Sequence, residues 1–335
     1  MTGNTLFSKM ISAVLILLIT AAFPQQNPIE LKFATLAPQS TAQGKALRAI
    51  ARDLFFQSEK TIKLMVYYGG QMGDETEMIE KIQYKALDGG AFTGLGLGNA
   101  CSEVRVLELP GLFQNPSEVD HVYSAIEPVL DNYFRKKGYV LICLAETGNA
   151  YFFSKQNIKS IADIRASKMW LWKGDRLVEE FMKELRIPAR PVNFTEVIPS
   201  LQTGLIDGVY CSPAPLAALQ WHTEIKYMLD LPISYVTGGF VISLSSWKKL
   251  SADQQKIIRE VMKKAVIGLT AENRANDRET LLLLQKNGIG INKASGESAV
   301  ITETGKKLRS TLNGVLFPAE LVQQIDTILS QFRKK

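Results

Sequence analysis

The sequence predicts an α/β protein of two lobes that are joined by one long helix near the C-terminal end. The chain has 335 residues, about twice the size of a usual single domain, which favours two structural units. Strand-like and helix-like segments alternate along the chain, and the alternation starts again after Gly148. A later helical pattern over residues 251–287 would be roughly 50 Å long at about 1.5 Å per residue. Such a helix is long enough to lie along both lobes, as in a hinged protein.

The first unit is predicted to contain parallel strands that are covered by helices. The expected strands are residues 30–35, 61–68 and 139–146, with a short strand and glycine-rich loop at 89–98, and the expected helices are 42–56, 74–87 and 117–135. Asp74 is expected to cap its helix, with Glu77 completing a capping box. The almost wholly apolar strand 139–146 is typical of a strand that is buried on both faces of a sheet.

The second unit is predicted from a renewed alternation of strands and helices. The expected strands are residues 151–153, 168–172 and 207–211, and the expected helices are 175–185 and 195–203. A further strand is expected at residues 240–244. Ser251 and Gln254 form a capping-box pattern at the start of the long helix, which is expected to stop at Gly288. We therefore expect lobe I to comprise residues 27–146 and 237–300, lobe II 147–236, and a C-terminal helical segment 301–335.

The N-terminus has the features of a secretory signal peptide. Lys9 precedes an apolar run of fourteen residues, 10–23, which is too short to cross a bilayer because spanning takes about 20 residues. Small residues precede Phe23, so cleavage is expected after Ala22. A buried N-terminal helix is the alternative. We expect residues 1–22 to be a signal peptide and the mature protein to be exported to the periplasm.

The composition excludes several classes of function. The 39 basic and 33 acidic residues are interspersed, which is not typical of a nucleic-acid-binding protein. His121 and His222 are the only histidines and have no metal-ligand spacing around them. The chain has three cysteines without a CxxC motif and lacks GxSxG and P-loop motifs. We therefore expect no metal, no cofactor, no essential disulfide and no enzymatic activity.

Two glycine-rich segments and one tryptophan pair are candidate binding motifs. The glycines of residues 67–78 precede a helix N-terminus, but the acidic residues there would repel an anion, so a structural turn is favoured. The glycines of residues 94–98 lack the spacing of a dinucleotide fingerprint. Trp170 and Trp172 lie on one face of a predicted strand, near the end where α/β folds bind ligands. They either face a ligand or pack beneath a neighbouring helix.

Six segments of the sequence resemble, in order, the solute-binding subunits of TRAP transporters, the DctP-like family. The segments are LKFATLAP near Lys32, GGQMGDETEM at Gly69, LELPGLF at Leu107, SIADIRASKMW at Ser160, PVNFTEVIPSLQTGLIDG at Pro191 and SSWKKLSADQQKIIREV at Ser245. The resemblance implies a periplasmic-binding-protein-like fold of two lobes with crossing strands and a long bridging helix. It also implies that the lobes close on a ligand, which is delivered to a membrane permease.

The sequence departs from this family at positions that matter for the ligand. Most relatives have an arginine where this chain has Trp170, and that arginine binds the ligand carboxylate. A second common arginine has no counterpart in residues 148–152, and a usual asparagine falls at about Cys211. Burying a carboxylate without a counter-charge costs several kcal/mol, so we expect a neutral or hydrophobic solute. The Trp-x-Trp pattern resembles a subtype that works with a tetratricopeptide-repeat partner.

We therefore expect a solute-binding subunit of a TRAP-type transporter that captures its ligand by cleft closure. The expected ligand-binding residues are Leu95 from lobe I together with Trp170, Trp172, Phe194, Tyr210, Cys211 and Tyr235. The alternative in the same class is a binder of organic acids that uses another cation. A sensor subunit and a secreted hydrolase on the same fold are further alternatives, but a hydrolase requires a nucleophile and base in contact.

Overall fold

The computed structural model describes residues 27–294 and 296–334, with the side chains of 276–278 left aside. The expected signal peptide, residues 1–22, lies outside the described residues. Within the described part of the chain, no helix is both long and apolar enough to cross a membrane.

Lobe I is built around a five-stranded sheet with the order β2-β1-β3-β10-β4. Its strands are β1 (Ile29–Ala34), β2 (Ile62–Tyr67), β3 (Gly89–Thr93), β4 (Tyr139–Asn149) and β10 (Tyr235–Ser243). β1 pairs in parallel with β2 and β3, whereas β10 runs antiparallel to β3 and β4. Its helices are α1 (Ala42–Gln57), α2 (Glu75–Gln83), α3 (Gly94–Ala100), η1 (Ser102–Glu108), α4 (Pro116–Lys136) and α9 (Leu244–Trp247).

Lobe II is built around a six-stranded sheet with the order β11-β9-β5-β8-β6-β7. Its strands are β5 (Tyr151–Ser154), β6 (Met169–Trp172), β7 (Ala189–Val192), β8 (Gly208–Cys211), β9 (Tyr227–Asp230) and β11 (Gly290–Lys293). Its helices are α5 (Ile161–Ile164), α6 (Arg176–Glu184), η2 (Phe194–Glu196), α7 (Val197–Gln202), α8 (Pro213–Ala218) and η3 (Trp221–Thr223). The parallel β6 is flanked by β7 and β8.

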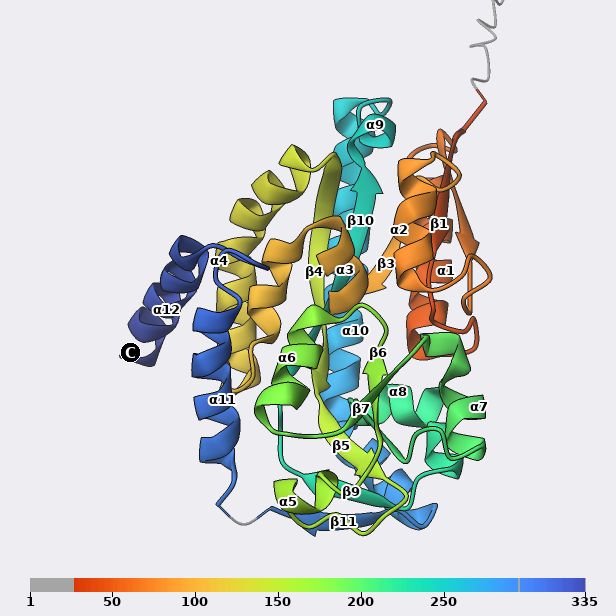
Figure 1. The fold of residues 1–335 in the computed structure, drawn as a ribbon. Coiled ribbons are helices and arrows are strands. Elements are labelled where there is room, and N and C mark those ends of the chain that lie inside the picture. The colour runs from red at the N-terminus through yellow and green to blue at the C-terminus, as the bar shows by residue number, and fades with distance from the viewer. Residues whose placement is uncertain (1–26, 295, 335) are drawn as a thin grey trace, which may run out of the picture.

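Two strands and one long helix connect the lobes, which confirms the predicted fold class. β4 of the first sheet is separated from β5 of the second only by Ala150, and β10 returns beside β4. Helix α10 (Ala252–Lys286) contacts α1 and β4 in lobe I and α8 in lobe II (Figure 1). The capping box at Ser251 is present, because Gln254 N donates to Ser251 Oγ at 3.2 Å and Ser251 N donates to Gln254 Oε1 at 2.9 Å.

The C-terminal segment consists of α11 (Ser298–Thr311) and α12 (Ala319–Arg333), which lie along one flank of the molecule (Figure 1). α12 packs on α4 of lobe I, where Arg333 pairs with Glu118 at 2.7 Å. α11 packs on α6 of lobe II, where Lys307 pairs with Glu184 at 2.7 Å. The segment therefore contacts both lobes.

Three sequence-based expectations are wrong in detail. β11 pairs with β9, so residues 290–293 belong to the sheet of lobe II and not to the expected lobe I range 237–300. Residues 94–100 form helix α3 instead of a glycine-rich loop, and a Cβ at Gly94 would lie 2.1 Å from Glu108 Oε2. The expected capping box at Asp74 is absent, because the Asp74 carboxylate accepts from Glu75 N and its other contacts lie outside helix α2.

Candidate functional site

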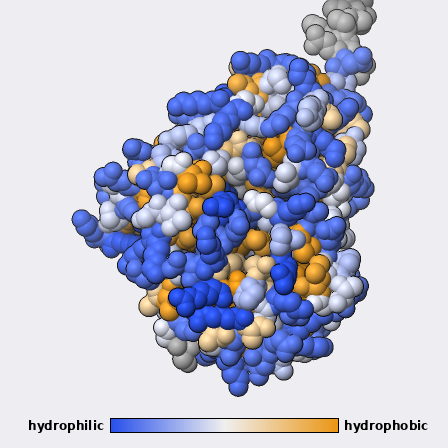
Figure 2. All heavy atoms as spheres, viewed as in Figure 1, coloured by the Kyte–Doolittle hydropathy of each residue, from blue (hydrophilic) through white to orange (hydrophobic). Residues whose placement is uncertain are grey.

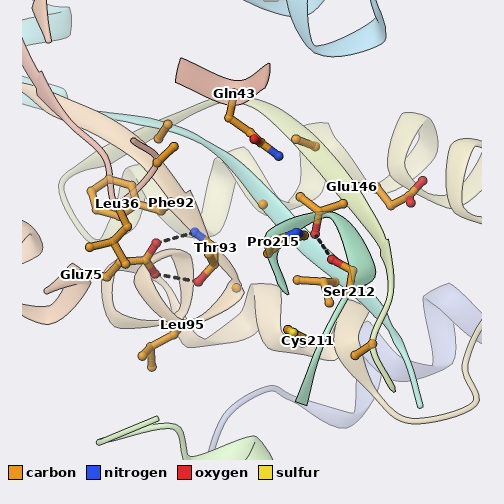
Figure 3. Close-up of a pocket in the computed structure, with 18 of the residues that line it drawn as sticks. Leu36, Gln43, Glu75, Phe92, Thr93, Leu95, Glu146, Cys211, Ser212 and Pro215 are labelled. Atoms are coloured by element: carbon orange, nitrogen blue, oxygen red, sulfur yellow. Dashed lines mark hydrogen bonds between the residues drawn. The ribbon is translucent and has the colours of Figure 1, made fainter. Parts of the chain in front are cut away.

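A cavity of about 270 Å³ lies between the two lobes. Figure 3 shows Leu36 and Phe92 from lobe I on one side of it and Cys211, Ser212 and Pro215 from lobe II on the other. Figure 2 shows hydrophobic side chains, surrounded by hydrophilic ones, across the middle of the face it presents. Most of the residues that line the cavity are apolar.

Five aromatic side chains of lobe II form a cluster that lines the cavity. The members of this aromatic cluster are Trp170, Trp172, Phe194, Tyr210 and Trp221. Trp170 stacks on Tyr210 with ring centroids 5.2 Å apart, and Trp172 stacks on Phe194 at 5.0 Å. The indole N–H of Trp170 donates to the Val192 carbonyl at 3.0 Å. Trp170 therefore offers its ring, and not a free donor, to the cavity.

The carboxylate of Asp74 connects the two lobes beside the aromatic cluster. Asp74 caps α2 in lobe I and is buried. It accepts hydrogen bonds from Trp172 Nε1 at 3.0 Å and from the backbone N–H of Phe194 at 2.8 Å, both in lobe II. Hydrogen bonds to an ionised acceptor are stronger than those between neutral groups. Asp74 thus joins helix α2 of lobe I to two residues of lobe II.

A buried charge cluster forms a second connection between the lobes. Arg105 on η1 lies 2.7 Å from Glu108 in the same lobe and 2.8 Å from Asp175, which caps α6 of lobe II. Burial acts to lower the pKa of Arg105, but the nearby Asp175 and Glu108 outweigh it and raise the pKa above the usual range. Burial raises the pKa of the Glu108 carboxyl even though Arg105 opposes this.

Glu75 is a further buried carboxylate of lobe I that lines the cavity. It accepts hydrogen bonds at 2.7 Å from the backbone N–H of Thr93, the Thr93 hydroxyl and the backbone N–H of Gly96 (Figure 3 shows the pair with Thr93). Burial raises the pKa of Glu75 to about 7, although these three donors favour the charged form.

Acidic groups outnumber basic ones around the cavity. Among the described residues that line it, Arg105 is the one cation, whereas four are carboxylates: Glu75, Glu108, Glu146 and Asp175. Arg105 is already paired, and Glu146 accepts from Arg274 Nε at 2.9 Å. The lining therefore offers a solute anion no unpaired cation within the described part of the chain.

Six of the seven residues expected at the site line the cavity: Leu95, Trp170, Trp172, Phe194, Tyr210 and Cys211. Leu95 is part of helix α3 and not of a loop. Burial raises the pKa of the Cys211 thiol, which keeps it uncharged. Tyr235 is not among the lining residues; its ring packs edge-on against Phe113 with centroids 6.1 Å apart. That the lining residues contact a ligand stays a prediction.

Several important residues were not identified from the sequence. The sequence indicates Asp74 only as a helix cap, and no pattern in it marks Trp221 as a member of the site. Arg105 and Asp175 are 70 residues apart, so no local pattern indicates their contact. Gln43 on α1 points into the cavity (Figure 3). The one signal in the sequence that could have indicated Gln43 is its position among the apolar residues of helix α1.

Within the part of the chain that the structure describes, no group of histidine, cysteine or acidic residues could hold a metal ion.

The family model DctP, described as bacterial extracellular solute-binding protein, family 7, matches residues 33–307. A solute-binding protein of Chromohalobacter salexigens is 25% identical over 269 residues, which cover 78% of each chain.

Solved structures share the fold. A TRAP periplasmic solute-binding protein from Desulfovibrio salexigens, with bound orotic acid, has a TM-score of 0.85 at 18% identity and covers 90% of this chain and 99% of its own. A second, from Xanthobacter autotrophicus with bound β-D-galacturonate, has a TM-score of 0.84 at 20% identity with coverage of 90% and 99%. The ligands of both are organic acids.

Proposed function

Because the chain belongs to the bacterial extracellular solute-binding proteins of family 7, we propose that it captures a small solute outside the cytoplasm and delivers it to the membrane subunits of a TRAP transporter. Members of this family are solute-binding proteins and not enzymes. The cavity between the lobes is the binding site, and hinge closure is the mechanism.

Closure follows from how the lobes are connected. β4, β10 and α10 are the connections around which the lobes rotate, and Asp74 and Arg105 each form hydrogen bonds across the cleft. These hydrogen bonds would break on opening, so a solute that fills the cavity shifts the equilibrium towards the closed state.

We propose a neutral, largely apolar solute, and the observation that carries this is the charge balance of the lining. The one cation among the described lining residues is held by two carboxylates, so an entering anion would lose its hydration without gaining a free counter-charge. The aromatic cluster offers apolar area to such a solute. The Gln43 side chain has no hydrogen-bond partner among the described residues, and we assign it as the polar contact to the solute.

The second candidate is an organic acid, and the comparisons favour it over the first. The similar proteins of Desulfovibrio salexigens and Xanthobacter autotrophicus hold orotic acid and β-D-galacturonate. In this chain Arg105 would be the counter-ion, and it would have to exchange Asp175 for the solute carboxylate. The charges around this chain's cavity, and not its fold, distinguish the two candidates.

Export and the partners complete the proposal. Residues 1–22 are proposed to direct the chain to the periplasm, which N-terminal sequencing of the exported protein tests: a start near Phe23 is expected, and retention of residues 1–22 would contradict it. The membrane permease is the proposed partner, and the Trp-x-Trp pattern supports a tetratricopeptide-repeat protein as an additional one.

Calorimetric titration combined with small-angle scattering tests the function. The panel contains dicarboxylates, sugar acids, fatty acids and their neutral alcohols and amides. We expect a neutral compound to bind and the radius of gyration to decrease, whereas an unchanged radius at saturating solute would count against hinge closure. Sub-micromolar binding of an organic acid would select the second candidate, and binding by no small solute would overturn the proposed function.

A further inference from the structure

The contact between Arg105 and Asp175 joins the two lobes within the cavity lining. One guanidinium nitrogen of Arg105, in lobe I, lies 2.8 Å and 3.0 Å from the two carboxylate oxygens of Asp175, in lobe II. Both residues are 5% exposed, and both line the cavity. The contact is therefore a desolvated charge pair at the place where a solute would lie.

Asp175 interacts with Arg105 as a solute carboxylate would. Arginine binds carboxylate ligands through charge-assisted hydrogen bonds of this length. A second nitrogen of Arg105 is held by Glu108 at 2.7 Å, and Glu108 in turn accepts from the backbone N–H of Thr237 at 2.8 Å. Both terminal nitrogens of the Arg105 guanidinium are thus held by the protein's own carboxylates.

We propose that Asp175 is a specificity-determining residue: it occupies, from the opposite lobe, the position at Arg105 where a solute carboxylate would bind, and so excludes organic acids. The inference rests on the proposed function and deepens it. An unpaired or like charge placed against the wrong ligand is a general means of achieving specificity. Because the pair crosses the cleft, it forms as the lobes close, and an acid already in the cavity would oppose closure.

The test replaces Asp175 by asparagine. Asp175 caps α6 by accepting from Val178 N at 3.1 Å, and asparagine is equally favoured at that position, so Asp175→Asn removes the charge and keeps the cap. Calorimetric titrations use D-galacturonate and octanoate as acids and 1-octanol as the neutral probe. We expect Asp175→Asn to bind at least one of the acids at least tenfold more tightly than the wild type does.

Two controls keep the result interpretable. Glu179→Gln removes one exposed carboxylate from the first turn of the same helix and should leave the affinity for the acids unchanged. Arg105→Met added to Asp175→Asn should abolish the gain, because the proposal places the acid on Arg105. Asp175→Ser, which also retains a capping oxygen, serves if the asparagine variant fails to fold.

The outcomes separate this inference from the proposed function. If the wild type captures a neutral solute but neither Asp175 variant gains affinity for an acid, Asp175 is not the specificity residue and the transport function stands. A gain that survives Arg105→Met also overturns the inference. Tight binding of D-galacturonate or octanoate by the wild type would overturn it as well, whereas a wild type that captures no solute of any class contradicts the function itself.

Discussion

The Asp74 carboxylate accepts a hydrogen bond from Trp172 Nε1 at 3.0 Å, although the two residues belong to different lobes. The helix cap of lobe I is thereby joined to the aromatic cluster of lobe II. The same carboxylate accepts from Phe194 N at 2.8 Å, so two members of the cluster are positioned by one residue across the cleft. Both the solute affinity and the closure of the lobes should therefore depend on Asp74.

Replacing Asp74 by serine should weaken closure with little loss of stability. Serine retains a capping oxygen, so we expect the free energy of unfolding to change by about 1 kcal/mol or less. Its shorter side chain cannot replace the hydrogen bonds to Trp172 and Phe194. Small-angle scattering should show a larger radius of gyration without solute. Asn115→Ser, at the cap of α4 away from the cavity, is the control and should leave the radius unchanged.

Trp170→Leu should reduce solute affinity at least tenfold, which is about 1.4 kcal/mol. Trp170 contacts the four other members of the aromatic cluster and lines the cavity, and buried tryptophans often dominate binding energy. Trp247→Leu is the matched control, because Trp247 is 3% exposed on α9 and does not line the cavity. Equal affinity losses in both variants, measured by calorimetry, would mean that destabilisation and not contact causes the effect.

Gln43→Leu should weaken the binding of a neutral solute that has a polar group more than the binding of one without. The Gln43 amide points into the cavity from α1, and its side chain has no hydrogen-bond partner among the described residues (Figure 3). Comparing 1-octanol with octyl methyl thioether by calorimetry isolates the polar contact. Gln57→Leu, at the exposed end of the same helix, should change neither affinity. Unchanged discrimination in Gln43→Leu would rule out the contact.

The stability of the protein should fall as the pH rises from about 5 to about 8, through Glu75. Burial raises the pKa of Glu75 to about 7 from its ordinary 4.5, so the folded state binds the proton more tightly than the unfolded state does. The stabilisation is present at low pH and is lost as the pH rises through the folded pKa, by about 3 kcal/mol at most. Glu75→Gln should flatten this part of the pH profile. Urea titrations at several pH values measure it, and identical profiles for both proteins would contradict the assignment.

The sequence predicts the fold well because the signals of its elements are local. Alternating polarity placed β1 and β6 within a residue or two, and the Ser251 capping box marked the start of α10. β11 was missed because its pairing with β9 is a long-range contact that four residues do not reveal. The helix at 94–100 was missed because glycines have low helix propensity, and here close packing against Glu108 and Phe92 requires them.

The site was predictable only in part. The tryptophans of β6 were found because period-two alternation places both on one face of a strand. The lobe contacts of Asp74 and Arg105 join residues 98 and 70 positions apart, which no spacing rule indicates. Tyr235 was expected to face the ligand, but β10 turns its ring towards Phe113 of lobe I. Side-chain direction on a crossing strand depends on the register with β4, which the sequence does not specify.

Native mass spectrometry of the exported protein, purified without refolding, tests the central claim most directly. The claim is that the cavity between the lobes holds a neutral solute, because its one described cation is paired with Asp175 and Glu108. We predict a complex with one small solute per chain, which is released on unfolding and is identified as uncharged at neutral pH. Release of an organic acid from the wild-type protein would contradict the account.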